Sequence, residues 1–407
     1  MAVSPTDGVV GTDLRIHGME NGYVCSSPEG ICLQQPRLSH DGLLESDAHG
    51  PRSGRASGGP PVTRVLEPKL ENISLGRTGR TTTRLGFGCS SIMGSLGWRD
   101  SLAVLEAAWG AGIRHFDVAP MYGYGEAESC LGEFLSRHPN QVTVTTKFGI
   151  PGETGRPLAR LARAGLRPLL QRFPALKERL SSASAAEMPA LPDMSRLEKP
   201  TSERDPNPIF NAGEAKRSLE RSLRALRCDR IDVWLLHEVT ASDLVDDALL
   251  GFLEDSFASG VIGTYGVGTD RGEIGDLLRR HPEYCPTLQY EWSIFHSVPA
   301  TAELFRIHHR SLTSTFRALH AVLASDKECC SRWSRLTGVD VGDAAMLSKL
   351  MLKAAFVLNP ESVILFSSKN AAHVRANADL VSDNTLAEAA TTLYEIVQSE
   401  LVSPGQL

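Results

Sequence analysis

The stretch that decides the fold is IRHFDVAPMYGYGEAESCLGEFLSRHPNQVTVTTKFG, residues 113–149. It begins with a short apolar strand, Ile113 to Val118, and passes through a Gly-rich turn into an amphipathic helix, Glu126 to Leu135. A second buried strand, Val142 to Phe148, ends it. Two short apolar strands joined by a helix are typical of parallel pairing with the helix outside the sheet. The stretch therefore predicts an α/β protein.

The same alternation continues on both sides of this stretch. Further strands are predicted over Thr81 to Gly88, Ile231 to Leu236, Thr264 to Gly268, Pro286 to Glu291 and Ser362 to Phe366. Helices are predicted over Ser101 to Trp109, Gly213 to Leu226 and Asp243 to Phe257, and near 311–324, 343–357, 371–379 and 386–400. By itself, this pattern is compatible with a barrel or with a doubly wound sheet.

One part of the alternation is compressed. The candidate for the seventh strand is Leu304 to His308, which leaves only residues 296–303 for the helix before it. An irregularity is therefore predicted around the sixth and seventh strands.

Two segments fall outside the alternation. Residues 1–70 are rich in Gly, Pro and Ser and have little to bury, so we predict a disordered N-terminal extension before a single domain over 71–407. Residues 150–206 separate a strand from its following helix, which predicts a βα-loop insertion on the side where active sites of such folds lie. The insertion is interpreted as a solvated excursion or a substrate lid.

Composition excludes several classes of protein. The chain has 407 residues, is 42% hydrophobic and contains no apolar run long enough to span a membrane. Its net charge of −6 provides no general basic field for nucleic acid. Its 8 cysteines have no metal-type spacing, so we expect no metal, a reducing compartment and a cytoplasmic location. Nothing in the sequence indicates an oligomeric state.

Polar side chains end three successive predicted strands. Asp117 ends the first and is followed five residues later by Tyr122, Lys147 ends the next, and His237 ends the strand after the insertion. Each alone is compatible with a structural role, as an ion pair or a core residue. Their joint placement at the carboxyl ends of parallel strands predicts one site.

These side chains suit protonation of a carbonyl oxygen while hydride arrives at carbon. A tyrosine is a weak acid at neutral pH, so a neighbouring ammonium, Lys147, is expected to stabilise the phenolate of Tyr122. Asp117 is expected to hold Lys147 in place and charged. His237 is expected to donate a hydrogen bond that orients the substrate oxygen.

The motifs Asp117–Glu126 (D-x-A-P-x-Y-G-x-G-E), Thr146-Lys147 and Leu235-Leu236-His237 resemble the aldo-keto reductases, and the resemblance spans about Ile73 to Asn377. It implies a (β/α)8 TIM barrel that binds a nicotinamide cofactor across its mouth. It also implies Tyr122 as general acid/base, Lys147 and Asp117 as its tuning pair, and His237 as the carbonyl-orienting donor.

The resemblance also implies cofactor-binding residues. Gly88, Cys89 and Ser90 follow the first barrel strand near the nicotinamide, and Thr269 and Gln289 stand where the family binds the carboxamide. The segment from Phe366 to Asn377 resembles the one that holds the adenosine phosphate, with candidate residues Ser367, Ser368, Lys369, His373 and Asn377. The positive charges there favour NADP over NAD. Gly268-Thr269 departs from the family's Ser-Asn pair, and the family's nicotinamide-stacking aromatic has no counterpart.

We therefore expect an oxidoreductase that transfers hydride between NADP(H) and a small aldehyde, ketone or sugar. The insertion and the fifth-strand sequence place it near the branch of aldose 1-dehydrogenases and pyridoxal-type reductases, where the physiological direction would be oxidation with NAD. Two alternatives remain open. One is a non-catalytic, cofactor-sensing binding subunit, and the other is a barrel that has kept the four polar residues but lost productive cofactor binding.

Overall fold

The computed structural model describes residues 70–150, 208–298 and 304–402, and all of them belong to one compact unit, Arg64–Leu407. Eight parallel strands of this unit form a closed barrel in the order β10-β3-β4-β5-β6-β7-β8-β9. In chain order they are β3 (Leu85–Gly88), β4 (His115–Asp117), β5 (Thr143–Phe148), β6 (Ile231–His237), β7 (Ile262–Gly268), β8 (Thr287–Glu291), β9 (Phe305–His309) and β10 (Ser362–Phe366). The expected barrel is confirmed, and the doubly wound alternative is excluded.

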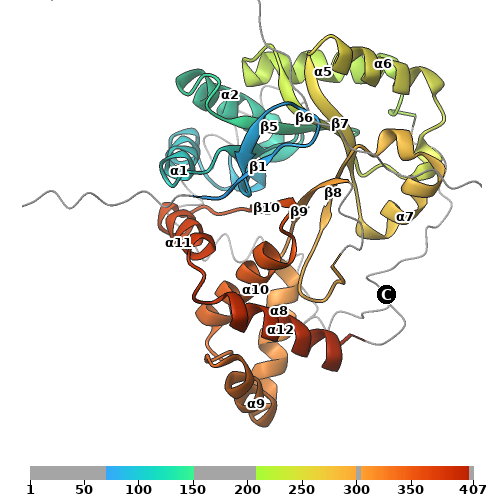
Figure 1. Cartoon of the computed structure of the whole chain (residues 1–407). Helices are drawn as coiled ribbons and strands as arrows, with labels where there is room; N and C mark the ends of the chain where they lie inside the picture. The colour runs from blue at the N-terminus through green and yellow to red at the C-terminus, as the bar shows by residue number, and fades with distance from the viewer. Residues whose placement is uncertain (1–69, 151–207, 299–303, 403–407) are drawn as a thin grey trace, which may run out of the picture. The chain divides into compact units, whose positions relative to one another are not determined.

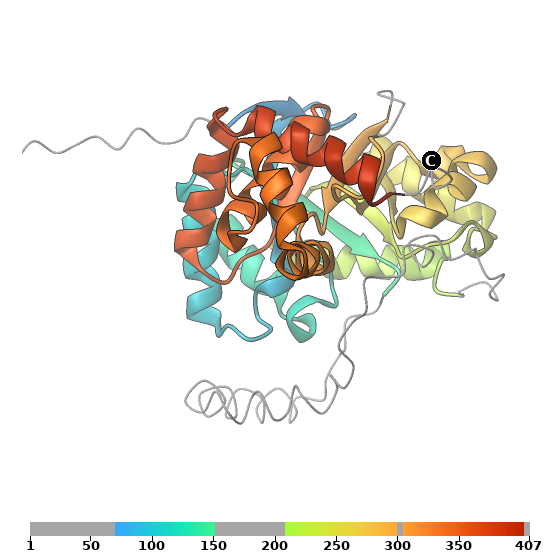
Figure 2. The same cartoon turned by 90° about the horizontal axis from the view of Figure 1, so that it is seen from below.

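Helices lie outside the strands in both views of the molecule (Figures 1 and 2). They are α1 (Trp98–Gly110), α2 (Ala127–Arg137), α5 (Ala212–Leu226), α6 (Asp247–Ala258), α7 (Arg271–Arg280), α8 (Thr313–Ser325), α9 (Lys327–Thr337), α10 (Ala344–Leu358), α11 (Ala371–Ser382) and α12 (Ala387–Glu400). Short 3₁₀ segments are η1 (Cys89–Ser91), η2 (Tyr122–Gly125), η4 (Ala241–Asp243) and η5 (Pro282–Tyr284). None of the helices in the described ranges combines the length and the apolar character that a bilayer span needs.

A small hairpin covers the amino-terminal end of the barrel. Strands β1 (Asn72–Ser74) and β2 (Thr81–Thr83) pair antiparallel, and Leu75 in the turn packs into the barrel core with Val233, Ile307 and Val363. Arg80 ties the hairpin to β6 by donating to Asp232 Oδ1 at 2.9 Å. Because this end is plugged by apolar packing, the opposite end is the open one.

The prediction of one strand over Thr81 to Gly88 was wrong, because Arg84 divides it. The Arg84 guanidinium is buried, pairs with Glu71 at 2.6 Å, and donates to the carbonyl oxygens of Phe356 and Asn359. These contacts turn the chain between the hairpin strand β2 and the barrel strand β3. The alternation of apolar residues in the sequence does not reveal such a turn.

The predicted irregularity lies in the helix layer. Strands β8 and β9 pair in regular parallel register from Thr287 opposite Phe305 to Glu291 opposite His309. The helix expected over 296–303 is not formed at residues 296–298, and residues 299–303 lie outside the described ranges. After β9 the chain adds α8, α9 and α10 before β10, and α9 was not predicted.

The helix α7 was also missed by the sequence pattern. Its residues are mostly polar, and Leu277 is its one buried residue, so the periodic apolar signal is weak. The predicted extension over 1–70 lies outside the described residues, apart from Leu70, as does the predicted insertion after Ile150. Both remain predictions, as does the domain boundary at 71.

Candidate active site

Each barrel strand contributes at least one residue, within two positions of its carboxyl end, to the lining of a cavity of about 350 Å³. Side chains alternate along a strand, so the residue two positions after a core residue faces the same interior. On β6, for example, Val233 and Leu235 fill the barrel core and His237 lines the cavity above them. The eight residues are Gly88, Asp117, Lys147, His237, Gly268, Gln289, His309 and Ser367.

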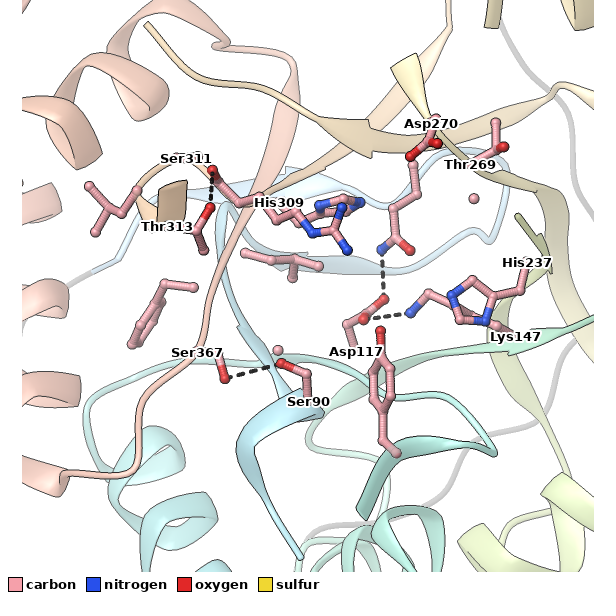
Figure 3. A pocket seen from close by; sticks show the side chains of 18 of the residues that line it. Ser90, Asp117, Lys147, His237, Thr269, Asp270, His309, Ser311, Thr313 and Ser367 are labelled. Atoms are coloured by element: carbon pink, nitrogen blue, oxygen red, sulfur yellow. Dashed lines mark hydrogen bonds and ion pairs between the residues drawn. The ribbon is translucent and has the colours of Figure 1, made fainter. Parts of the chain in front are cut away.

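Asp117 and Lys147 form a buried ion pair at the floor of this cavity (Figure 3). Lys147 Nζ donates to Asp117 Oδ1 at 2.6 Å and to the Val118 carbonyl oxygen at 3.1 Å. Burial by itself lowers the pKa of Lys147, but the Asp117 carboxylate and Tyr122 outweigh burial and raise it above its usual value. Lys147 is therefore an ammonium at neutral pH.

Tyr122 begins the 3₁₀ segment η2 and lines the same cavity. Lys147 Nζ lies 5.4 Å from the centroid of its ring. The ammonium is the strongest single influence on the Tyr122 pKa and lowers it, as the sequence predicted. Burial and the Asp117 carboxylate act in the opposite direction and together prevail, so the pKa lies above its usual value. Tyr122 therefore carries its proton at neutral pH.

His237 packs edge-on to Tyr122, with ring centroids 6.4 Å apart. Burial, followed by the charges of Lys147 and Arg310, lowers the pKa of His237 to about 3. The imidazole is therefore neutral at physiological pH and has one N–H to donate. Its Nδ1 is buried and has no hydrogen-bond partner in the described part of the chain.

Two predicted carboxamide-binding residues have partners within the protein. Gln289 Nε2 donates to Asp117 Oδ2 at 2.6 Å, and Thr269 Oγ1 donates to the Val239 carbonyl oxygen at 2.8 Å. Both residues line the cavity. At Gly268, a Cβ atom would lie 3.3 Å from Gln289 Oε1, so the glycine leaves space beside this amide.

The two sides of the cavity differ in charge. Thr269 and Asp270 lie on the side of His237 (Figure 3). Glu238, which follows His237 in the chain, adds a second carboxylate to the lining. Ser311, Thr313 and Ser367 lie on the other side (Figure 3). An anion would be repelled by the first side and is better accommodated on the second.

The second side has unused hydrogen-bonding groups. Ser311 Oγ is buried and has no partner among the described residues, and it lies just before α8. Within the described ranges no side chain caps the amino terminus of α8, so its first N–H groups are available to an anion. The predicted Ser90, Ser367 and Asn377 also line the cavity, and Ser90 Oγ lies 3.5 Å from Ser367 Oγ. These residues fit the phosphate groups of a nicotinamide cofactor.

Four predicted cofactor residues do not line the cavity. Cys89 is fully buried, and burial raises the pKa of its thiol well above its usual value. Ser368 accepts from the Asn370 N–H at 3.1 Å, and Lys369 and His373 are exposed around the start of α11. The Ala372 N–H of that helix is already bonded to Asn370 Oδ1. Lys369 and His373 could reach only a group that extends beyond the cavity.

Sequence reasoning missed His309 and Arg310. The predicted seventh strand ended at His308, one residue short, and a strand extended by one residue would have placed His309 among the inward-facing ends. Burial, followed by Arg310, lowers the pKa of His309 to about 3. Arg310 has a positive φ of 56° and lies 3.8 Å from Glu291. No group of acidic, His or Cys residues in the described ranges is arranged to hold a metal.

Comparisons with known proteins identify the family of this barrel. A family model described as "Aldo/keto reductase family" matches residues 84–310, more than half of the chain. Pyridoxal 4-dehydrogenase from Microbacterium luteolum is 46% identical over 82 residues, which cover 19% of this chain and 24% of that protein. D-threo-aldose 1-dehydrogenase from Pseudomonas sp is 34% identical over 203 residues, 48% of this chain and 52% of that protein. The chain thus spans at most about half the length of these relatives.

Solved structures share the fold at low sequence identity. An aldo-keto reductase from Bacillus halodurans in its holo form has a TM-score of 0.53 and 17% identity, over 83% of this chain and 99% of that one. An aldo/keto reductase from Klebsiella pneumoniae in complex with NADP and acetate has a TM-score of 0.52 and 15% identity, over 83% and 98%. These similarities show the barrel fold and say nothing about the substrate of this chain.

Proposed function

Because the chain belongs to the aldo/keto reductase family, we propose that it transfers a hydride between NADP(H) and a small carbonyl or alcohol substrate. The observation that carries this proposal is the placement of Lys147 Nζ 5.4 Å from the Tyr122 ring centroid, with the His237 ring on the same cavity. A proton donor, a cation and a neutral hydrogen-bond donor then surround one space in which a carbonyl oxygen can sit.

Tyr122 acts as the general acid in reduction. Its raised pKa keeps the phenol protonated at neutral pH, so a proton is available for the carbonyl oxygen. As the proton leaves, the Lys147 ammonium stabilises the phenolate that forms. In the opposite direction, the deprotonated form of Tyr122 takes the proton from an alcohol, so oxidation requires the phenolate and is favoured at high pH.

His237 orients the substrate. A neutral imidazole donates one hydrogen bond to the carbonyl oxygen without adding a charge to the cavity. Its position beside Tyr122 directs that oxygen towards the phenol. Asp117 keeps Lys147 in place and does not itself exchange a proton with the substrate.

The cofactor is held on the side of the cavity that lacks carboxylates. Ser311, the uncapped start of α8, Ser367 and Asn377 take its phosphate groups, and Lys369 and His373 outside the cavity meet a 2′-phosphate. When bound, the nicotinamide supplies or accepts the hydride. Preference for NADP over NAD rests on the two exposed basic side chains.

The substrate is small. A cavity of about 350 Å³ lies at the lower end of the range of ligand pockets, about 300–1,000 Å³. The dehydrogenases of pyridoxal and D-threo-aldoses among the similar proteins make pyridoxal and aldoses the first compounds to test. Their names also support the alternative direction, oxidation of an aldose, for which NAD is tested beside NADP.

The test is a screen of the full chain against short aldehydes, ketones, aldoses and pyridoxal, with both cofactors in both directions, followed by nicotinamide absorbance. We expect Tyr122→Phe to lower turnover by about 10²–10⁴-fold, because the general acid is lost. Cofactor affinity, measured by quenching of the 5 tryptophans, is expected to stay nearly unchanged.

The matched control is Tyr124→Phe, because Tyr124 belongs to the same turn but does not line the cavity. We expect it to keep wild-type turnover. Unchanged turnover in Tyr122→Phe would refute the assignment of the acid. Absence of tryptophan quenching by either cofactor would instead favour a barrel without productive cofactor binding, and quenching without turnover would favour a sensing subunit.

A further inference from the structure

A hydrogen bond crosses the barrel between Gln289 and Asp117. Gln289 Nε2 donates to Asp117 Oδ2 at 2.6 Å, and the side chains come from β8 and β4. In the closed strand order, β5, β6 and β7 separate these strands on one side and β3, β10 and β9 on the other, so they stand opposite each other. Gln289 is 1% exposed and Asp117 is 3% exposed. The contact therefore forms in a dry environment, where hydrogen bonds to a charged group are strong.

The two oxygens of Asp117 have different partners. Oδ1 accepts from Lys147 Nζ, and Oδ2 accepts from Gln289 Nε2. An ionised carboxylate has only acceptors, so the amide must present its nitrogen to Asp117. The amide oxygen Oε1 then lies on the side of Gly268. The orientation of the Gln289 amide is thus determined by the acid.

We propose that Gln289 is a positioning residue for the Asp117–Lys147 pair. By donating to Oδ2, the Gln289 amide keeps the Asp117 carboxylate from rotating, so Lys147 can donate only to Oδ1. Lys147 Nζ therefore remains 5.4 Å from the Tyr122 ring centroid instead of being drawn further towards Asp117. This inference rests on the proposed function, because the benefit of the position is proton delivery by Tyr122.

Gly268 is part of the same arrangement. A Cβ atom at position 268 would lie 3.3 Å from Gln289 Oε1 and 3.5 Å from the Leu235 Cδ1 atom. The first distance is tighter than an ordinary contact, so a side chain there would press on the amide. The glycine permits the position from which Gln289 reaches across the barrel.

Two substitutions at Gln289 separate the hydrogen bond from packing. Gln289→Met keeps the length of the side chain but removes the donor, and Gln289→Glu places a second carboxylate against Asp117. Two carboxylates in one buried place retain a proton or repel each other. The control is Thr287→Val, because Thr287 lies on the same face of β8, two residues below, and does not line the cavity.

The decisive measurement is the ionisation of Tyr122. It is obtained from the ultraviolet difference titration of each protein against the same protein carrying Tyr122→Phe, so it needs no turnover. A cation held close lowers the pKa of a phenol, and one held further away lowers it less. We expect the Tyr122 pKa to rise in Gln289→Met, to rise further in Gln289→Glu, and to stay unchanged in Thr287→Val.

Turnover supplies the second measurement. We expect kcat of Gln289→Met to fall about 10-fold, and the loss of activity at high pH to move to higher pH, because Tyr122 must be protonated for reduction. Gly268→Ala is expected to raise the Tyr122 pKa by less than Gln289→Met does. It serves as the test variant if the Gln289 variants fail to fold.

The proposal is overturned if the Tyr122 pKa in Gln289→Met equals that of the wild type, whatever happens to cofactor affinity. If the Gln289 variants fail to fold, the same outcome in Gly268→Ala overturns it. Weaker cofactor binding with an unmoved titration would make Gln289 a cofactor ligand alone. A wild-type protein without turnover in the whole screen would refute the proposed function, and the titration would still decide the role of Gln289.

Discussion

Gly123 packs directly against Met93, and this contact sets the turn that carries Tyr122. A Cβ atom at Gly123 would lie 2.4 Å from the Met93 Cβ atom and 2.9 Å from the Ile92 carbonyl oxygen. Gly123 also has a φ of +59°, which favours glycine. Met93 is buried, and its N–H donates to Ser101 Oγ at 3.0 Å, so it cannot easily move away. The loop after β3 thus fixes the loop after β4.

We expect Gly123→Ala to lower kcat by about 10–100-fold, because the added methyl group displaces the turn and with it the Tyr122 hydroxyl. The measurement is steady-state turnover of a folded variant, with cofactor affinity determined in parallel. Gly79→Ala is the matched control, since Gly79 has a φ of +72° but no atom within 4 Å of its Cβ position. Equal turnover in the two variants would show that the contact with Met93 does not position Tyr122.

The buried histidines predict that the protein loses stability in acid. Burial lowers the pKa of His308, which is packed edge-on to Tyr290, to about 3, whereas an unfolded histidine titrates near pH 6.5. Between these values the unfolded state binds more protons, so this contribution is fully present above about pH 6.5 and is lost as the pH falls towards 3. Each such histidine adds a slope of about 1.4 kcal/mol per pH unit in that window.

We expect His308→Leu to reduce the slope of the unfolding free energy against pH between pH 4 and 6 by about 1.4 kcal/mol per pH unit, because one fewer proton is bound on unfolding. The measurement is urea unfolding at several pH values. The slope is informative even if the absolute stability of the variant changes. An unchanged slope would mean that His308 is not neutral in the folded protein.

For the cofactor, we expect Lys369→Ala to weaken NADPH about tenfold or more and to leave NADH nearly unchanged, because only NADPH has a 2′-phosphate. Affinity is measured by tryptophan quenching. Ser311→Ala serves as the comparison, since a buried serine at the start of α8 would contact groups that both cofactors share. Equal losses for both cofactors in Lys369→Ala would place the 2′-phosphate elsewhere.

The strand-end residues were predictable because of the period of a β-strand. In Thr143–Phe148, Thr145 and Lys147 are two residues apart and face the same interior, and the same holds for Leu235 and His237 on β6. Parallel strands then bring these ends to one edge of the barrel. This inference needs only the period of each strand and the parallel pairing, and no knowledge of which residues far apart in the sequence are in contact.

Other features were not predictable because they depend on distant segments. The turn at Arg84 needs carbonyl oxygens of α10 and of the loop after it, and the mainly polar helix α7 leaves little apolar period to read. The final pKa of Tyr122 depends on how deeply many elements bury it and on the nearby Asp117 carboxylate, and only together do these outweigh the effect of the one cation that the sequence identifies.

The sequence by itself determined the parallel strands with helices outside them and the assembly of Asp117, Tyr122, Lys147 and His237 at the carboxyl ends of these strands, because alternation and strand ends are local properties of the chain. Its local pattern left a barrel and a doubly wound sheet open, and the closed strand order decided between them. Only the tertiary structure decided that Gln289 holds Asp117 from the opposite strand, 172 residues away, and that Tyr122 keeps its proton. Closing the barrel sets these distances and the exclusion of water, and neither is encoded in any single segment.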